Sequence, residues 1–171
     1  VYDPETDPLL DAHYSVADPT SKAVCKAELQ RSLGLAVDEG TMVVGMVTRL
    51  VSHKGLDLVR EVMGQMMELN VQFVLLGSGD WQYESFFREA VSHYPGRVSA
   101  TLGFNEGLAH RIYSGADCFL MPRKSEPCGL AQMISLRYGT IPIVRSTGGL
   151  RASVRDSVPY THLTPPTKTA V

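Results

Sequence analysis

Five short apolar runs, each separated from the next by a segment with helical spacing, constrain the fold of this 171-residue chain more than any other feature. The clearest run, residues 41–47, is apolar on both faces, as a central strand of a parallel sheet requires. Strands that alternate with helices through short connections form a doubly wound parallel sheet. The sequence therefore predicts an α/β, Rossmann-like domain. Its predicted strands are residues 41–47, 71–76, 97–102, 118–121 and 141–144.

The segments between these runs have the spacing of amphipathic helices. The first is capped by Thr20 or Ser21 and stopped by Gly34, and the last is stopped by Gly139. The predicted helices are residues 21–33, 55–68, 81–93, 106–114 and 130–138. The inner face of the first is expected to carry Ala23, Val24, Ala27, Leu29 and Leu33, and that of the second Leu56, Leu58, Val59, Val62, Met63 and Met66.

Charged residues follow the first and the fourth predicted strand. In the common strand order 3-2-1-4-5 these two strands are neighbours, and a crevice opens at their carboxyl ends. The loop after the first strand contains Arg49 and Lys54, and the loop after the fourth contains Glu126. Two cations beside the free N–H groups of a helix start suit a diphosphate, although basic residues in loops are more often simply solvated.

The motif around Glu126 allows more than one reading from its residues alone. Its carboxylate precedes a helix whose first N–H groups can accept an anion, but the helix dipole by itself also favours an acidic residue there. Cys128 has no evident histidine partner, so a small buried residue is a better reading than a nucleophile. Gly77-Ser78-Gly79 lacks the third glycine of a dinucleotide fingerprint and follows the second strand, so we reject that motif.

Composition excludes several classes of function. The 16 basic and 18 acidic residues leave a formal charge of -2 without a basic block, so we expect no nucleic-acid partner. No apolar run approaches the ~20 residues of a spanning helix, so we expect no membrane partner. The five histidines lack HxxxH and HxH spacing and the three cysteines lack CxxC spacing. We therefore predict no metal ion, and a reducing compartment.

The two ends of the chain differ in composition from the part between them. Residues 1–19 hold three prolines among four aspartates, which favours an extended surface linker that contributes no core. Residues 157–171 have no periodicity and three prolines, and we predict a non-native tail. Because the first residue is Val1, we expect a fragment of a longer protein.

Five ordered segments carry a more specific signal: TRLVSHKGLDLV at 48–59, VLLGSGD at 74–80, LAHRIYSGADCFLMP at 108–122, EPCGLAQM at 126–133 and RYGTIPIVRSTGGL at 137–150. Together they resemble the C-terminal half of bacterial glycogen synthase and of plant or algal starch synthase, the retaining glucosyltransferases of GT-B fold. The resemblance covers residues 2–156. It implies that residues 20–156 are a truncated nucleotide-sugar-binding domain and that residues 1–19 are the interdomain linker.

The resemblance also implies a reaction. The family transfers glucose from ADP-glucose to the non-reducing end of an α-1,4-glucan, without a metal or other cofactor, in a cleft between two Rossmann-like domains. By this resemblance Arg49 and Lys54 hold the donor diphosphate and stabilise the leaving ADP. Glu126 matches the acidic residue near the donor glucose. These three are the candidate catalytic residues.

Other residues are implied to bind the donor. Phe104 stands where the family places an aromatic ring against the adenine, and Gly77 is expected near the adenosine. The motif after the fourth strand is expected to offer backbone N–H groups to the distal phosphate. Its substrate-binding candidates are Cys128, Gly129, Leu130 and Ala131.

The chain departs from the family in two respects. The family usually reads PSRFEPCGL where residues 122–130 read PRKSEPCGL, so an aromatic is lost and the positive charge is displaced. The N-terminal domain, with its KxGG loop and acceptor site, is missing, so we expect the chain alone to be inactive and to meet the glucan only through that domain.

Two alternatives are an inert ADP- or ADP-glucose-binding module and another GT-B nucleotide-sugar enzyme. The resemblance predicts the bacterial cytoplasm or the plastid stroma.

Overall fold

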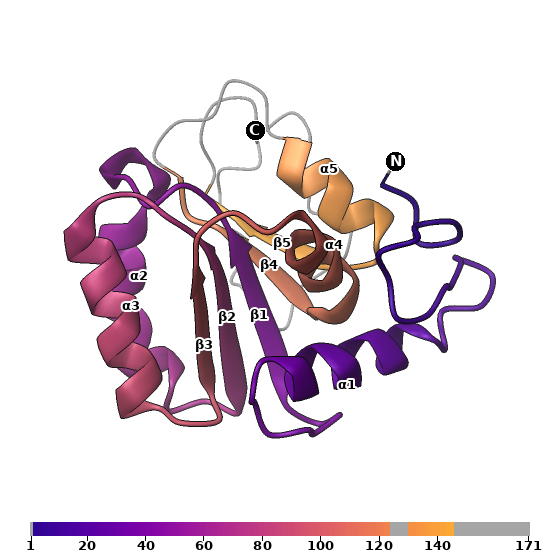
Figure 1. Ribbon diagram of the computed structural model, residues 1–171, viewed down its shortest axis with the longest axis horizontal. Coiled ribbons are helices and arrows are strands. Elements are labelled where there is room, and N and C mark those ends of the chain that lie inside the picture. The colour runs from indigo at the N-terminus through magenta and orange to yellow at the C-terminus, as the bar shows by residue number, and fades with distance from the viewer. Residues whose placement is uncertain (1, 124–129, 146–171) are drawn as a thin grey trace, which may run out of the picture.

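The computed structural model describes residues 2–123 and 130–145. These residues form a five-stranded sheet in the order β3-β2-β1-β4-β5, with every neighbouring pair parallel (Figure 1). The order is that of a doubly wound fold whose switch point lies between β1 and β4, which confirms the fold class and the predicted strand order. The strands are β1 (Met42–Val47), β2 (Val71–Gly77), β3 (Val98–Leu102), β4 (Cys118–Met121) and β5 (Ile141–Val144).

Helices cover both faces of the sheet (Figure 1). α2 (Leu56–Met66) and α3 (Trp81–His93) pack on one face, and α1 (Lys22–Ser32), α4 (Glu106–Gly115) and α5 (Leu130–Arg137) pack on the other. Each agrees with a predicted helix to within two residues at either end. The sequence pattern does not predict the short 3-10 helix η1 (Ser52–Lys54), which lies in the loop after β1.

Two predicted helix faces are wrong in part. Leu58, expected on the inner face of α2, is 46% exposed, and Ala23 and Val24 of α1 are exposed as well. The inner face of α1 holds Leu29, as predicted, but it also buries the polar residues Lys26 and Gln30. Their side chains donate hydrogen bonds of 2.9 Å to carbonyl oxygens in the segment before β1. A buried polar group that finds such a partner costs little, and apolar periodicity cannot reveal it.

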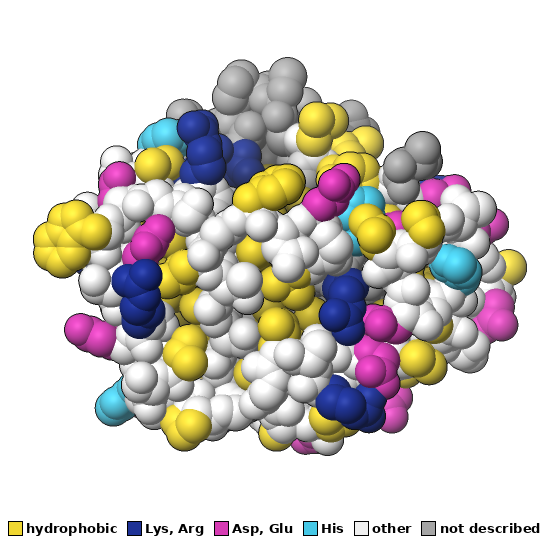
Figure 2. All heavy atoms as spheres, in the orientation of Figure 1, with side chains coloured by type: hydrophobic (Ala, Val, Ile, Leu, Met, Phe, Trp, Pro, Cys, Tyr) yellow, Lys and Arg dark blue, Asp and Glu magenta, His cyan; other side chains and the backbone are white. Residues whose placement is uncertain are grey.

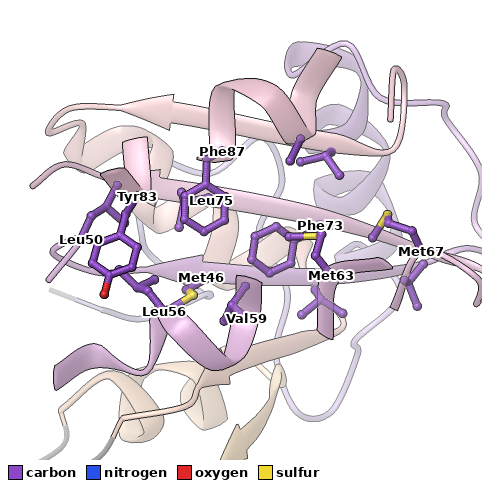
Figure 3. Close-up of a cluster of buried hydrophobic side chains, with 14 of the residues drawn as sticks. Met46, Leu50, Leu56, Val59, Met63, Met67, Phe73, Leu75, Tyr83 and Phe87 are labelled. Atoms are coloured by element: carbon purple, nitrogen blue, oxygen red, sulfur yellow. The ribbon is translucent and has the colours of Figure 1, made fainter. Parts of the chain in front are cut away.

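The core on the side of α2 and α3 explains why β1 and β2 are so apolar. Figure 3 shows Phe73 and Leu75 of β2 beside Met46 of β1 and the side chains of the two helices. Phe73 stacks on Phe87 of α3 with ring centroids 6.1 Å apart. Leu50 is fully buried in the same cluster. The core therefore also holds the loop that follows β1.

Residues 1–19 are not the coreless surface segment that their composition predicts. Asp7 is only 1% exposed, and its Oδ2 accepts a hydrogen bond from Tyr138 Oη (2.5 Å) and lies 2.6 Å from His110 Nδ1. Tyr14 is buried too, and its hydroxyl donates to Tyr138 O (2.8 Å). We call Asp7, Tyr14, His110 and Tyr138 the Asp7 cluster. It fastens the start of the chain to α4 and to the end of α5.

Partners from distant parts of the chain make the burial of Asp7 possible. Burial alone would raise the pKa of its carboxyl group, but hydrogen bonds from Tyr138 and His110 outweigh that effect and the pKa of Asp7 lies below its ordinary value.

The linker role of residues 1–19 and the domain boundary at residue 156 stay predictions. The suggested tail, residues 157–171, lies outside the described residues. In the part of the chain that the structure describes, no helix is both long and apolar enough to span a bilayer.

Candidate functional site

The candidate site lies at the carboxyl ends of the strands, beside the switch point between β1 and β4. The loop after β1 is tied to the loop after β2 by two backbone hydrogen bonds, from Leu50 N to Ser78 O (2.9 Å) and from Asp80 N to Leu50 O (2.8 Å). Arg49 is the direct neighbour of this anchored residue. Its backbone is therefore fixed at the edge where open α/β sheets bind ligands.

Glycines allow the two loops to come this close. A Cβ atom on Gly77 would lie 1.9 Å from Thr48 O, and one on Gly79 would lie 2.4 Å from Leu50 O. No side chain fits at either position. This packing accounts for the Gly-Ser-Gly sequence without a dinucleotide site, while the predicted place of Gly77 near an adenosine stays a prediction.

A third glycine joins the loop after β1 to the end of β4. Gly55 has φ +80°, and a Cβ atom there would lie 1.8 Å from Pro122 O. The residue separates η1 from α2, so the chain turns directly against the residue that follows β4. Lys54 and Arg123 are the chain neighbours of these two contacting residues. The loops after the first and fourth strands thus meet, as the strand order predicted.

The cations at this meeting point influence one another. The pKa of Lys54 lies below its ordinary value, first because the ammonium group is partly buried and then because Arg123 and Arg49 are positive neighbours. Neither Arg49 nor Lys54 forms an ion pair with any described residue. Figure 2 shows Lys and Arg side chains together at the upper edge of the molecule, where the strands end in Figure 1. Such a group of like charges favours an anion.

Three further candidates lie after β3 or at the start of α5. Phe104 follows β3 and is 92% exposed, so one ring face or both can accept a flat partner. Leu130 is the first residue of α5 and is 76% exposed, whereas Ala131 packs against the core. The first residue of α5 is therefore open to solvent, and the first N–H groups of a helix have no partner within the helix.

Three other candidates, Glu126, Cys128 and Gly129, lie outside the described residues. Within the described ranges there is no group of three or more His, Cys, Asp and Glu side chains that could hold a metal ion.

The sequence interpretation does not count Arg123 among the candidate site residues, although it allows that this cation adds positive potential near the phosphates. Arg123 is half-buried, follows Pro122 at the end of β4, and lies close enough to Lys54 to lower its pKa. The signal that could have found it is its position: Arg123 follows the fourth strand closely, just as Arg49 follows the first. The contact between Gly55 and Pro122, which brings the two loops together, has no signature in the pattern of apolar residues.

Comparisons with known proteins agree with this arrangement. Residues 31–171 match the family described as glycosyl transferases group 1. Over 155 residues the chain is 55% identical to a glycogen synthase of Anaeromyxobacter dehalogenans and 53% identical to one of Geobacillus thermodenitrificans, covering 91% of this chain and 32% of each relative. The catalytic domain of starch synthase IV from Arabidopsis thaliana, solved with ADP and acarbose, matches with a TM-score of 0.85 and 40% identity over 92% of this chain and 34% of that one.

These findings confirm the resemblance drawn from the ordered motifs and the GT-B type of fold. The chain spans about a third of the length of the relatives it matches. The family match includes the whole sheet and both loops that meet at the switch point. The chain therefore belongs to the glycosyl transferases of group 1.

Proposed function

We propose that this chain is the donor-binding half of a retaining glucosyltransferase that moves glucose from ADP-glucose to an α-1,4-glucan. The observation that carries the proposal is the pair of cations, Arg49 and Lys54, without a carboxylate partner among the described residues at the switch point. The relatives named glycogen synthase and the starch synthase structure solved with ADP support it.

The chemistry needs positive charge at this place. When the bond between the glucose C1 and the diphosphate oxygen breaks, its electron pair stays on the oxygen, and the leaving ADP gains negative charge. Arg49 can bind two phosphate oxygens at once, and Lys54 adds a compact charge beside it. Groups that bind the departing diphosphate more strongly than the intact donor lower the barrier. With side-chain cations in this role, the proposal includes no metal ion.

The remaining contacts are proposed from the family resemblance. Glu126 would lie near the donor glucose, and the N–H groups at the start of α5, at Gly129, Leu130 and Ala131, would bind the distal phosphate. Phe104 would stack on the adenine, for which its exposed ring is suited. Gly77 and Cys128 would complete the donor site.

The proposal assigns donor binding, but not transfer, to the chain by itself. The matched relatives are about three times longer, and the glucan would bind to the part that this chain does not include. A purified sample should therefore bind ADP-glucose and release no ADP when glycogen is added. The bacterial cytoplasm or the plastid stroma stays the predicted location.

The test is titration calorimetry of the chain with ADP and with ADP-glucose. Arg49→Ala should weaken ADP binding at least tenfold, about 1.4 kcal/mol, because a charge-assisted phosphate contact is lost. Arg88→Ala is the matched control, since Arg88 is an exposed cation on α3 that pairs with Glu84. Equal affinities of the wild type and Arg49→Ala would reject the role of Arg49 and with it the site.

A further inference from the structure

Arg123 occupies a position that the proposed donor site does not yet use. Its neighbour Pro122 makes the backbone contact with Gly55, and Lys54 stands on the other side of that contact. Gly55 is buried against Pro122 with no room for a Cβ atom, so the two loops cannot separate without breaking this contact. The positions of Lys54 and Arg123 relative to each other are therefore set by the backbone.

The charge of Arg123 affects the pKa values of two neighbouring groups, Lys54 and Tyr113. Among the charged neighbours of Lys54 it has the larger effect, ahead of Arg49, in lowering the pKa of that ammonium group. It also acts against the rise in the pKa of Tyr113, which burial drives to about 12. Burial lowers the pKa of Arg123 itself, but a guanidinium remains charged at neutral pH. A half-buried, permanent charge in this place is screened less by salt than a surface charge.

We propose that Arg123 is the third cation of the diphosphate site and that it makes the site prefer free ADP to ADP-glucose. The inference rests on the proposed function, since it assumes that the site binds a nucleoside diphosphate. Free ADP carries one more negative charge than its glucose ester, because the terminal phosphate is no longer esterified. Each added cation attracts the more highly charged ligand more strongly. A site with three cations therefore has a larger difference between its affinities for ADP and for ADP-glucose than a site with two.

This preference has a direct consequence for the reaction. An interaction that is stronger for the product ADP than for the donor grows as the glycosidic bond breaks, and it speeds the departure of the leaving group. The same interaction slows the release of ADP afterwards. Arg123 would therefore speed the cleavage of the bond and slow the release of ADP.

The experiment compares Arg123→Gln with Arg123→Lys by calorimetry of ADP and ADP-glucose at fixed ionic strength. Loss of the charge should weaken ADP binding about tenfold and ADP-glucose binding only about threefold, so the preference for ADP falls. Arg123→Lys keeps the charge and should retain most of the preference. Arg88→Gln, which removes a distant exposed cation, should change neither affinity.

A second measurement needs no ligand. NMR titration of the Lys54 side chain should give a higher pKa in Arg123→Gln than in the wild type, because a like charge is removed from its surroundings. Arg88→Gln should leave the pKa of Lys54 where it is. Circular dichroism of each variant shows whether it folds. If Arg123→Gln does not, Arg123→Met is measured in its place, because it also removes the charge, and an unchanged preference for ADP then overturns the role.

The possible outcomes separate the two proposals. A wild-type chain that binds neither ligand overturns the proposed function. A wild type that binds ADP, combined with equal losses for both ligands or no loss in Arg123→Gln, overturns the role of Arg123 alone. An Arg123→Lys variant that loses the preference as fully as Arg123→Gln also overturns it, because the charge is then not the cause.

Discussion

The two edges of the sheet use their cations in opposite ways. At the amino edge, Lys26 Nζ pairs with Asp117 (2.8 Å), and Lys22 Nζ donates to Ser114 O and to Thr140 Oγ1 (both 2.8 Å). At the carboxyl edge, Arg49 and Lys54 have no such partner among the described residues, and neighbouring cations lower the pKa of Lys54.

The difference shows how charge can be assigned to stability or to binding within one fold. The amino-edge lysines hold α1 to the starts of β1, β4 and β5, so their charges serve the chain itself. The carboxyl-edge cations repel one another, and no described residue forms an ion pair with Arg49 or Lys54. Such a group of cations would favour a ligand with several negative charges.

Removing the amino-edge carboxylate should have the largest effect on stability. Asp117 accepts a hydrogen bond from Val43 N (2.7 Å) and forms the ion pair with Lys26. We expect Asp117→Ala to lower the free energy of unfolding by about 3 kcal/mol, because the buried Lys26 ammonium loses its ion pair and a strand N–H loses its acceptor. Urea unfolding measures this. Arg49→Ala should change the same quantity by less than about 0.5 kcal/mol, and similar losses in both variants would erase the contrast between the edges.

The glycine that joins the two loops should come next. Gly55→Ala places a methyl group against Pro122 O at a positive φ, so we expect a loss of about 2 kcal/mol in the free energy of unfolding together with weaker ADP binding. Gly64→Ala is the control in the middle of α2, where nothing lies within 4 Å. That change should stabilise the chain by up to about 1 kcal/mol. If both substitutions behaved alike, the close contact at Gly55 would not matter.

Lys54→Met tests the carboxyl edge, where we expect a change in binding and none in stability. It should weaken ADP binding about tenfold, about 1.4 kcal/mol, while leaving stability unchanged or slightly raised, since a like charge is removed from the group. Calorimetry and urea unfolding of the same sample give the two numbers. A fall in stability with no change in ADP affinity would assign Lys54 to structure instead.

The smallest effect should appear in the pH dependence of stability. Burial lowers the pKa of Lys22 to about 8, against 10.5 for the ordinary side chain. Between these values the unfolded chain binds a proton that the folded chain does not, so this group makes stability rise with pH. From pH 7.5 to 9.5 the wild type should gain about 1 kcal/mol relative to Lys22→Met.

Urea unfolding at these two pH values checks the prediction, and parallel behaviour of the two proteins would show that Lys22 does not titrate in this way. The comparison stops below pH 10 because buried tyrosines act in the opposite direction there. Burial raises the pKa of Tyr14, Tyr113 and Tyr138, so the folded chain keeps protons that the unfolded chain loses.

Strand order and the meeting of the β1 and β4 loops could be predicted from the sequence because they depend on alternation, which is local. The buried face of α1 could not, since Lys26 and Gln30 are buried only because carbonyl oxygens elsewhere accept their hydrogen bonds. The contact that fixes the backbone beside Arg123 could not be predicted for a similar reason. It depends on one backbone contact between loops that are far apart in the sequence.

The Asp7 cluster has a practical consequence for anyone who wishes to shorten the protein. Composition would set a truncation point at residue 20, just before α1. Cutting there would remove the acceptor of the Tyr138 hydroxyl and the ring of Tyr14, exposing the inner surfaces of α4 and α5 to water. Aggregation of the shortened protein would then result from the loss of its first nineteen residues, and would say nothing about the nucleotide site.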